Sequence, residues 1–162
     1  MHYQLRPATN ADEDWQLAIY AGTRADELAL TGWSPSQCEA FVRQQHRAQQ
    51  QHYRAHFPLS VCQLILVDGV VAGRLWLDGR EDHVHILDIA LLPAWRGRGL
   101  GTRCLQDLAR GGQTLGIQVE LHNPARRLYE RLGFVAQGLP QGLHQAMFKP
   151  AARVPTEECL PS

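Results

Sequence analysis

A glycine-rich segment near the middle of the chain constrains the fold more than any other part of the sequence. Residues 93–102 read PAWRGRGLGT and directly follow the apolar run ILDIALL. Gly97, Gly99 and Gly101 allow the backbone to take a positive φ or to approach a ligand closely. A strand, a glycine turn and a helix start in this order expose backbone N–H groups at the positive end of a helix dipole. The segment therefore predicts an anion site at a strand–helix junction.

The common nucleotide motifs do not match this loop. A P-loop requires Gly-Lys followed by Ser or Thr, and the sequence contains no Gly-Lys pair. A dinucleotide fingerprint requires GxGxxG, and the third glycine is absent whether the motif starts at Gly97 or at Gly99. Two alternatives stay open at this point: a purely structural turn, and a nucleotide-binding oxidoreductase in which Glu120 takes the place of the ribose-binding acid.

Composition bounds the class of protein. The 162 residues suffice for one domain, with 44% hydrophobic and 20% charged residues and 16 basic residues against 16 acidic ones. This balance favours neither nucleic acid nor membrane as a partner, and the aliphatic runs are too short to span a bilayer. The four cysteines are dispersed and the N-terminus lacks an apolar signal region, so we expect a cytoplasmic protein with reduced thiols. We expect a single domain over residues 1–150 and a loose tail over residues 151–162; the sequence leaves monomer or homodimer open.

Periodicity and turn residues predict the order of the elements. Ser34, Pro35 and Gln37 form the capping-box signature of a helix start. Asp68-Gly69 predicts a β-hairpin turn. The predicted strands cover residues 3–9, 62–67, 70–79, 83–93, 116–121, 134–138 and 144–149, and the predicted helices cover residues 10–24, 34–56, 101–110 and 123–134, the last with Asn123 as its cap and Pro124 as its first residue. Hairpins followed by strand–helix units indicate an α/β or α+β fold with a mixed sheet.

Two motifs in this order resemble the GNAT acetyltransferase superfamily. The loop resembles the family's Arg/Gln-x-x-Gly-x-Gly/Ala motif, and the segment downstream resembles its Asn, Ala and Leu-Tyr-Glu-x-Leu-Gly-Phe pattern. The matching residues are Arg96, Gly99 and Gly101 in the loop, then Asn123, Ala125 and residues 128–134. The resemblance implies a GNAT acyl-CoA N-acyltransferase-like fold. In that fold a central, mostly antiparallel sheet is flanked by helices, and its fourth and fifth strands splay apart.

The resemblance also implies acetyl-CoA as co-substrate and no metal. The residues that it assigns to coenzyme A are Ala90, Leu91, Leu92, Arg96, Gly97, Arg98, Gly99, Leu100, Gly101, Thr102, Asn123 and Arg126. It makes the backbone N–H of Leu91 an oxyanion donor for the thioester. Asn123 can equally be a helix cap, as the residues themselves suggest. His52 and His56 have metal-ligand spacing on a predicted helix, but no third ligand accompanies them, so no metal site is predicted.

The resemblance implies that Tyr129 is the general acid that protonates the leaving thiolate. Without it, an aromatic residue on an amphipathic helix is more typical of a core position. A base is also needed, because primary amines are mostly protonated at neutral pH. Asp88 and Glu120 are the candidates for this base. Asp88 is the more unusual, because a carboxylate inside an apolar strand requires a partner, and the alternative is a structural acid bonded to the backbone or to an arginine.

We therefore expect an N-acetyltransferase that transfers an acetyl or short acyl group directly to a primary amine in a ternary complex. The acceptor, a small molecule or a peptide, is not identified by the sequence. Glu27 and Trp33 lie in the region that shapes the acceptor pocket in the superfamily, and they are the candidate acceptor contacts. The alternative is a sensor of the same fold that binds acyl-CoA without transferring the acyl group.

Overall fold

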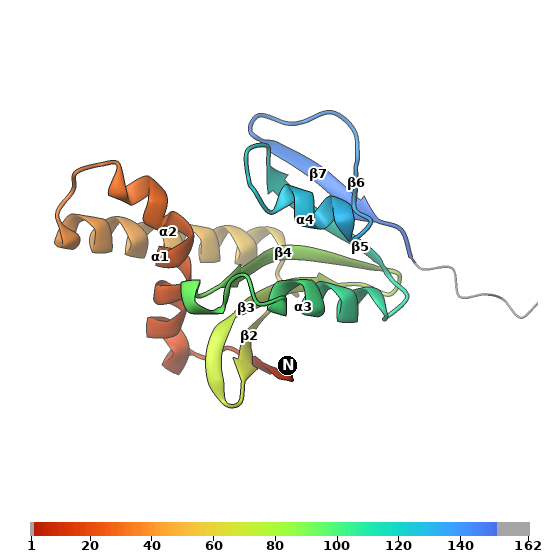
Figure 1. The fold of residues 1–162 in the computed structure, drawn as a ribbon, viewed down its shortest axis with the longest axis horizontal. Coiled ribbons are helices and arrows are strands. Elements are labelled where there is room, and N and C mark those ends of the chain that lie inside the picture. Colours follow the sequence, from red (N-terminus) through yellow and green to blue (C-terminus); the bar gives the residue numbers. More distant parts are fainter. Residues whose placement is uncertain (1, 152–162) are drawn as a thin grey trace, which may run out of the picture. The chain divides into compact units, whose positions relative to one another are not determined.

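The computed structural model describes residues 2–151, which form a mixed arrangement of strands and helices (Figure 1). The strands are β1 (Tyr3–Pro7), β2 (Val61–Val67), β3 (Val70–Gly79), β4 (His83–Leu91), β5 (Thr114–Glu120), β6 (Val135–Ala136) and β7 (His144–Lys149). The helices are α1 (Glu13–Ala29), α2 (Pro35–His56), α3 (Leu100–Ala109) and α4 (Arg126–Arg131), with short 3₁₀ turns η1 (Asn10–Asp12) and η2 (Pro93–Trp95). No helix among these residues is long and apolar enough to cross a membrane.

The strands are hydrogen-bonded in the order β1-β2-β3-β4-β5-β7-β6. The pairs β1–β2, β2–β3, β5–β7 and β6–β7 are antiparallel, whereas β4 and β5 are parallel. The parallel ladder joins His83–Ile86 to Thr114–Ile117 and stops there, although both strands continue. The predicted mixed and mostly antiparallel sheet is confirmed, and the early end of this ladder is what splayed fourth and fifth strands require.

The turn between β2 and β3 follows the sequence prediction. Asp68 has a φ of 50° and Gly69 a φ of 77°, and together they connect two antiparallel strands with a two-residue loop. Positive φ at both central residues is the signature of a type I′ turn, whose twist matches that of the flanking strands. Asp and Gly tolerate this conformation, which explains why the dipeptide predicted the hairpin correctly.

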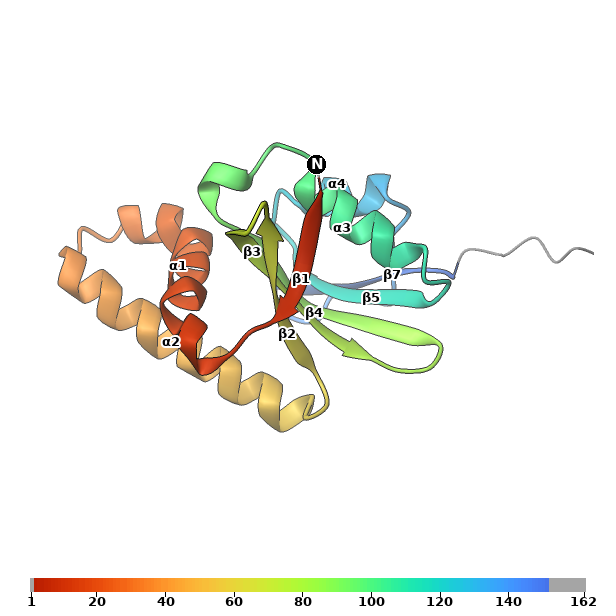
Figure 2. The same cartoon turned by 90° about the horizontal axis from the view of Figure 1, so that it is seen from below.

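Backbone contacts divide the chain into two compact units. The first contains the residues up to Asp78 together with Leu87–Gly101, and the second contains Gly79–Ile86 with the residues from Thr102 onward. In the first unit α1 and α2 lie side by side (Figures 1 and 2). Its core includes a cluster of apolar side chains from α1, β2, β3 and β4, formed by Ile19, Leu64, Val71 and Ala90. The first unit therefore brings the helical hairpin, the first three strands and the end of β4 together.

The helix starts in the first unit were predicted better than one of the helix ends. Ser34 accepts a hydrogen bond from the Gln37 N–H at 3.2 Å, and the Gln37 side chain accepts one from the Ser34 N–H at 2.9 Å, which confirms the capping box. Helix α1 continues to Ala29, five residues beyond the predicted end. Alanine and leucine have high helix propensity, and the Thr31 hydroxyl donates to the Leu28 carbonyl at 2.7 Å at the end of the helix.

In the second unit α3 and α4 lie on one side of β5 and β7 (Figure 2). Along β5, Leu115, Ile117 and Val119 are buried whereas Gln118 and Glu120 are exposed. This alternation is what one covered face of a sheet produces. The predicted strand pair near the C-terminus is confirmed as β6 and β7. Of the predicted tail over residues 151–162, residues 152–162 lie outside the described residues.

Helix α4 corrects the prediction that Asn123 caps it with Pro124 as the first helical residue. The helix begins at Arg126 and its N-cap is Ala125. The Asn123 carbonyl accepts from the Arg126 N–H at 3.0 Å, and the Asn123 side-chain oxygen accepts from the Ala125 N–H at 2.9 Å. Residues 123–126 therefore close a separate tight turn, because the asparagine side chain competes for the amide groups that would open the helix.

Gly73 allows β3 to pass very close to β4. A Cβ atom at this position would lie 2.3 Å from the Ala90 carbonyl oxygen and 2.8 Å from the Leu91 Cδ2 atom. The strand is also irregular here: Ile65 is opposite Gly73 and Leu66 is opposite Val71, which leaves Ala72 as an extra residue. Its carbonyl accepts a hydrogen bond from the Leu92 N–H at 2.8 Å.

We therefore expect Gly73→Ala to lower the free energy of unfolding by about 3 kcal/mol, because the added methyl group meets backbone atoms that cannot move aside. Gly79→Ala is the matched control on the same strand, since a Cβ there meets nothing within 4 Å. The control should change the free energy of unfolding by less than about 0.5 kcal/mol. Chemical denaturation of both variants measures the difference, and equal stabilities would contradict the close approach.

Candidate functional site

The glycine loop lies between the end of β4 and the start of α3, as the sequence predicted. After Leu92 the chain forms η2, in which the Trp95 N–H donates to the Leu92 carbonyl at 2.9 Å. Gly97 and Gly99 then take φ values of 72° and 82°. These values are unfavourable for residues with a Cβ, which accounts for the two glycines. Leu100 is 2% exposed and anchors the first turn of α3 in the core.

Two arginines of the loop are held by neighbouring groups of the same unit. The Arg96 Nε donates to the Leu91 carbonyl at 3.1 Å, so the guanidinium spans the loop that it belongs to. A Cβ at Gly22 of α1 would lie 3.2 Å from the Arg96 Nη2 atom, which shows how closely this helix packs against the loop. The Arg98 guanidinium lies over the Trp95 ring at 5.1 Å from its centroid. Both cations are thereby held next to the turn.

The loop fits an anionic group on physical grounds. Cβ atoms built at Gly97 and Gly99 meet no heavy atom within 4 Å, so the backbone at both glycines is bare. The first amide N–H groups of α3 have no acceptor within the helix and point along its axis toward the loop. A pyrophosphate there would meet N–H donors, the helix dipole and the charges of Arg96 and Arg98 together.

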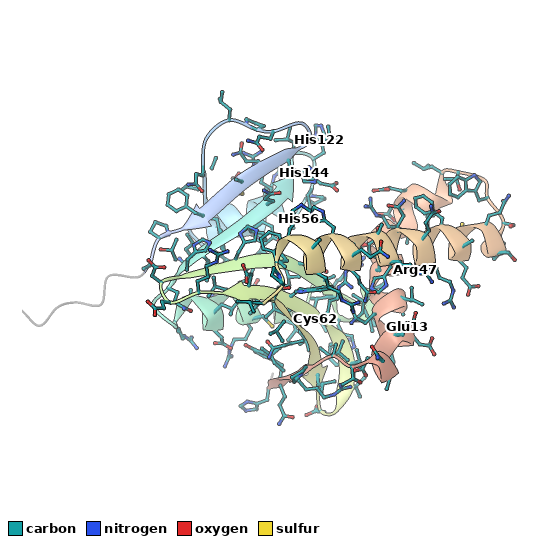
Figure 3. The ribbon with its side chains drawn as sticks, turned by 180° about the vertical axis from the view of Figure 1, so that it is seen from behind. Glu13, Arg47, His56, Cys62, His122 and His144 are labelled. Atoms are coloured by element: carbon teal, nitrogen blue, oxygen red, sulfur yellow. The ribbon has the colours of Figure 1, made fainter. Side chains whose placement is uncertain are left out.

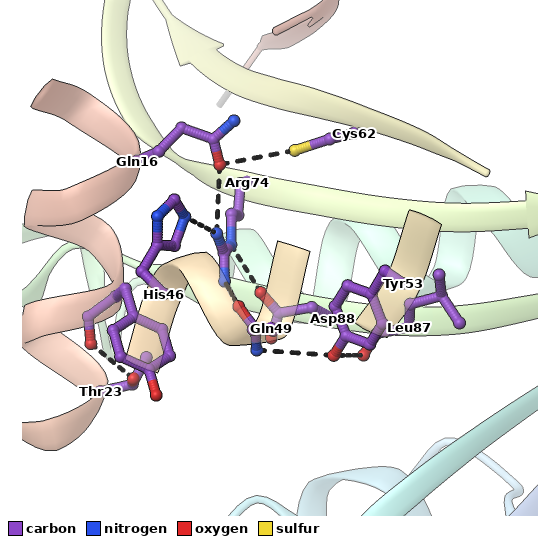
Figure 4. Close-up of polar contacts among 10 residues, drawn as sticks. Gln16, Thr23, His46, Gln49, Tyr53, Cys62, Arg74, Leu87 and Asp88 are labelled. Carbon is purple, nitrogen blue, oxygen red and sulfur yellow. Dashed lines mark hydrogen bonds and ion pairs between the residues drawn. The ribbon is translucent and has the colours of Figure 1, made fainter. Parts of the chain in front are cut away.

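A buried arginine forms the centre of a polar network in the same unit (Figure 4). Arg74 on β3 is 1% exposed, and its guanidinium contacts side chains from α1, α2 and β4. The Nε donates to Asp88 at 2.6 Å, the Nη1 donates to Gln16 at 3.1 Å and to the His46 Nε2 at 3.2 Å, and the Nη2 donates to Gln49 at 2.7 Å. A buried charge of this kind is tolerated only when it is paired and hydrogen-bonded.

Burial, together with this network, determines the protonation of two neighbouring side chains. Burial first, and then the positive charge of Arg74, lowers the pKa of His46 to about 4, so its imidazole is neutral at physiological pH and its Nε2 accepts from the arginine. Burial raises the pKa of Tyr53 to about 12. Its hydroxyl donates to the Leu87 carbonyl on β4 at 2.9 Å, which ties α2 to this strand.

Asp88 is thus placed by its contact with Arg74. Of the two alternatives left by the sequence, an acid bonded to an arginine describes its observed contact, with the carboxylate side chain 20% exposed. Sequence reasoning missed the arginine itself and its partners Gln16, His46 and Gln49. A signal was present, because a lone arginine inside the strand-like run VVAGRLWL is as unusual as an aspartate inside ILDIAL.

Of the other predicted catalytic residues, Leu91 at the end of β4 belongs to the first unit, and Tyr129 and Glu120 belong to the second. Tyr129 on α4 is 7% exposed, and its ring lies 5.8 Å from that of Phe134. Glu120 at the end of β5 is exposed and opposite His144 in the β5–β7 register. Asn123 uses its side chain for the turn before α4. The contact of Tyr129 with Phe134 is compatible with both alternatives from the sequence, a general acid and an aromatic residue of the core.

The other predicted residues are distributed along both units. Arg126 pairs with Glu130 on α4 at 3.1 Å, and Thr102 follows Gly101 in the first turn of α3. Glu27 is exposed and pairs with Arg24 at 3.1 Å. Trp33 is 44% exposed and makes an edge-on contact with Phe41 at 5.3 Å. These two candidate acceptor contacts lie at the end of α1 and at the turn before α2.

The strand–loop–helix junction and the mixed sheet define the class of the protein. Residues 25–134 match the Acetyltransferase (GNAT) family, and the chain belongs to this family. Acetyltransferases of the family use acetyl-CoA as the acetyl donor. The resemblance stated from the two motifs is thereby confirmed.

Individual relatives share shorter segments or the fold. The [ribosomal protein bS18]-alanine N-acetyltransferase of Haemophilus influenzae is 40% identical over 58 residues, which are 33% of this chain and 40% of that protein. PaiA N-acetyltransferase from Thermoplasma acidophilum, in a crystal structure with coenzyme A, superposes with a TM-score of 0.67 at 15% identity, covering 93% of this chain and 99% of the other. The ribosomal-protein-S18-alanine N-acetyltransferase from Escherichia coli gives 0.59 at 20% identity, covering 96% and 98%. At 15% and 20% identity, these two crystal structures show that the fold is shared.

The neutral His46 makes stability depend on pH. Its folded pKa of about 4 lies below the ordinary value of 6.5, so the unfolded chain binds more protons between these values. The stabilisation is therefore complete above pH 6.5 and is lost as the pH falls toward 4. We expect the free energy of unfolding to decrease over this interval more steeply in the wild type than in His46→Gln, which keeps an acceptor for Arg74. His52→Gln, an exposed histidine change on the same helix, should retain the wild-type slope in urea titrations.

Proposed function

We propose that the protein is an acetyl-CoA-dependent N-acetyltransferase of the cytoplasm that acetylates a primary amine by direct transfer in a ternary complex. The observation that carries the proposal is the glycine loop, with Gly97 and Gly99 at positive φ and a bare backbone at the N-terminus of α3. Acetyl-CoA supplies the activated thioester, and residues of this chain bind the coenzyme and assist the attack of the amine.

On the donor side, the N–H groups of the loop and the first turn of α3 bind the pyrophosphate. The ends of β4 and β5 are the proposed sources of backbone groups for the pantetheine arm. The N–H of Leu91 is the proposed oxyanion donor for the thioester carbonyl. Asn123 and Arg126 remain proposed contacts of the coenzyme.

For the chemical step, we assign Tyr129 as the general acid. The amine nitrogen attacks the thioester carbonyl, the carbon–sulfur bond breaks and the phenol gives its proton to the leaving sulfur. The amine must lose a proton, and Glu120 is the better proposed base of the two carboxylates. Asp88 accepts a short hydrogen bond from Arg74, and protonation of its carboxylate would break this ion pair.

The acceptor is open to experiment. The relative from Haemophilus influenzae is named as an alanine N-acetyltransferase of ribosomal protein bS18, and the match covers a third of this chain. A peptide with an alanine at its N-terminus is therefore one acceptor of a test panel. Lysine peptides, polyamines, amino acids and aminoglycosides complete the panel. Mass-spectrometric detection of an acetylated product from any of them supports the enzyme. Saturable acetyl-CoA binding with no product from the panel would favour the sensor alternative.

A substitution in the glycine loop tests whether the loop binds acetyl-CoA or is only a structural turn. Gly99→Ala adds a Cβ where φ is 82° and should weaken acetyl-CoA binding about tenfold, measured by calorimetry with NADH and ATP as specificity controls. Gly112→Ala is the matched control, because its φ of 77° imposes a comparable backbone cost in the turn after α3. It should leave the affinity unchanged. Binding of NADH in preference to acetyl-CoA would overturn the proposed donor.

The proposed general acid predicts a separation of turnover from binding. Tyr129→Phe keeps the ring beside Phe134 and removes the phenol oxygen, so turnover should fall about 100-fold while the Kd for acetyl-CoA changes by less than about threefold. Steady-state kinetics at several pH values, with calorimetry for the affinity, tests both parts. Tyr3→Phe on β1 serves as a control for loss of a phenol. Wild-type turnover of Tyr129→Phe across the pH range would exclude the role.

A further inference from the structure

A pocket of about 490 Å³ opens in the first unit, and the proposed transfer reaction does not use it. It lies where β1 ends and β2 begins, with the first turns of α1 on one side and the last turns of α2 on another. Gln16 on α1 lines it, six residues before Gly22, which packs against Arg96 of the glycine loop. Six residues span about 9 Å along a helix, so the pocket and the glycine loop contact α1 at separate positions.

The floor of the pocket presents a hydrogen-bond donor of fixed orientation. Gln16 is 6% exposed, and its Oε1 accepts from the Arg74 Nη1 at 3.1 Å and from the Cys62 thiol at 3.7 Å. A guanidinium only donates, so the atom that faces it must be the amide oxygen. Figure 4 shows the Gln16 Nε2 on the side of the amide away from Arg74 and Cys62. No acceptor for this Nε2 occurs among the described residues, and no fully buried side-chain nitrogen or oxygen in that part of the chain lacks a partner. The Nε2 is therefore accessible to solvent, and because Gln16 lines the pocket it can donate to a ligand there.

The rim of the pocket carries two opposite charges. Glu13 on α1 and Arg54 on α2 both line it and are exposed, and neither forms an ion pair with any residue in the described part of the chain. Glu13 lies three residues before Gln16, so the two side chains are neighbours on one face of α1. Figure 3 shows Glu13 on α1 and Cys62 on β2 in the view from behind.

The wall between floor and rim is neutral. Burial raises the pKa of the Cys62 thiol, which stays protonated and donates to Gln16. The Trp76 Nε1 donates to the Ser60 hydroxyl at 2.9 Å. Glu13 and Arg54 are therefore the charged side chains that a ligand in this pocket would meet.

We propose that this pocket binds a free α-amino acid. The carboxylate of such a ligand accepts from Arg54 and from the Gln16 Nε2, and its ammonium group pairs with Glu13. The ammonium and carboxylate groups of an α-amino acid are attached to one carbon, so a single ligand can meet the acid, the amide donor and the arginine that line this pocket. A simple carboxylate would leave Glu13 unpaired, and a simple amine would leave Arg54 and Gln16 unpaired.

The test is binding of each of the twenty proteinogenic L-amino acids to the full-length protein without acetyl-CoA, first by thermal shift and then by calorimetry. At least one amino acid should bind saturably with one site. Its N-acetyl derivative and its methyl ester should each bind at least about tenfold more weakly, because each loses one charge. Equal binding of either derivative, or no saturable binding by any amino acid, would overturn the proposal.

Three variants locate the binding. Gln16→Glu keeps an oxygen toward Arg74 and replaces the donor on the floor with an acceptor, and Arg54→Gln removes the cation from the rim; each should weaken binding at least about tenfold. Arg47→Gln removes an exposed arginine that lies on the same helix but does not line the pocket (Figure 3), and it should bind like the wild type. Circular dichroism establishes that the variants are folded. Binding that neither Gln16→Glu nor Arg54→Gln alters lies elsewhere, and the proposal is then wrong whatever the acetyl-CoA titration shows.

Discussion

The buried charge of Arg74 is the constraint on which most of the first unit depends. Its guanidinium lies in the core and contacts Gln16 of α1, His46 and Gln49 of α2, and Asp88 of β4. Replacement of a buried ion pair by apolar groups can be neutral, but removal of one partner leaves an uncompensated charge and is strongly destabilising. The two helices and β4 are therefore held in one arrangement around β3, because any displacement leaves at least one donor of the guanidinium without an acceptor.

The same strand also determines where the glycine loop begins. One residue before Arg74, Gly73 lets the backbone of β4 approach closely, and the extra residue Ala72 accepts from the Leu92 N–H at the point where β4 ends. The loop then turns back through Arg96, whose guanidinium returns to the Leu91 carbonyl. The position of the proposed pyrophosphate site thus follows from strand packing as well as from its own glycines, and a loop held by these contacts loses less conformational freedom when it binds a ligand.

The sequence predicts the parts of this architecture that depend on local chemistry. The Asp68-Gly69 turn, the Ser34 capping box and the glycine loop each follow from the conformational preferences of a few adjacent residues. The start of α4 does not, because Asn123 has two competing uses for its side chain, in a helix cap and in a separate turn. The Arg74 network could not be predicted for another reason. Arg74 is separated from its hydrogen-bond partners by up to 58 residues, and periodicity indicates that a position is buried but not which partners meet there.

Arg74 also links the polar core to the pocket proposed for an amino acid. Because the arginine only donates, it imposes the orientation of the Gln16 amide and leaves its Nε2 on the side away from the guanidinium (Figure 4). A ligand that accepts from this Nε2 stabilises the orientation that the network already selects, and by reciprocity an intact network increases the affinity for the ligand. Through Arg74, Gln16 is connected by hydrogen bonds to Asp88 on β4, the strand that leads into the glycine loop, so the orientation that the ligand favours is also the one that the contact with β4 requires.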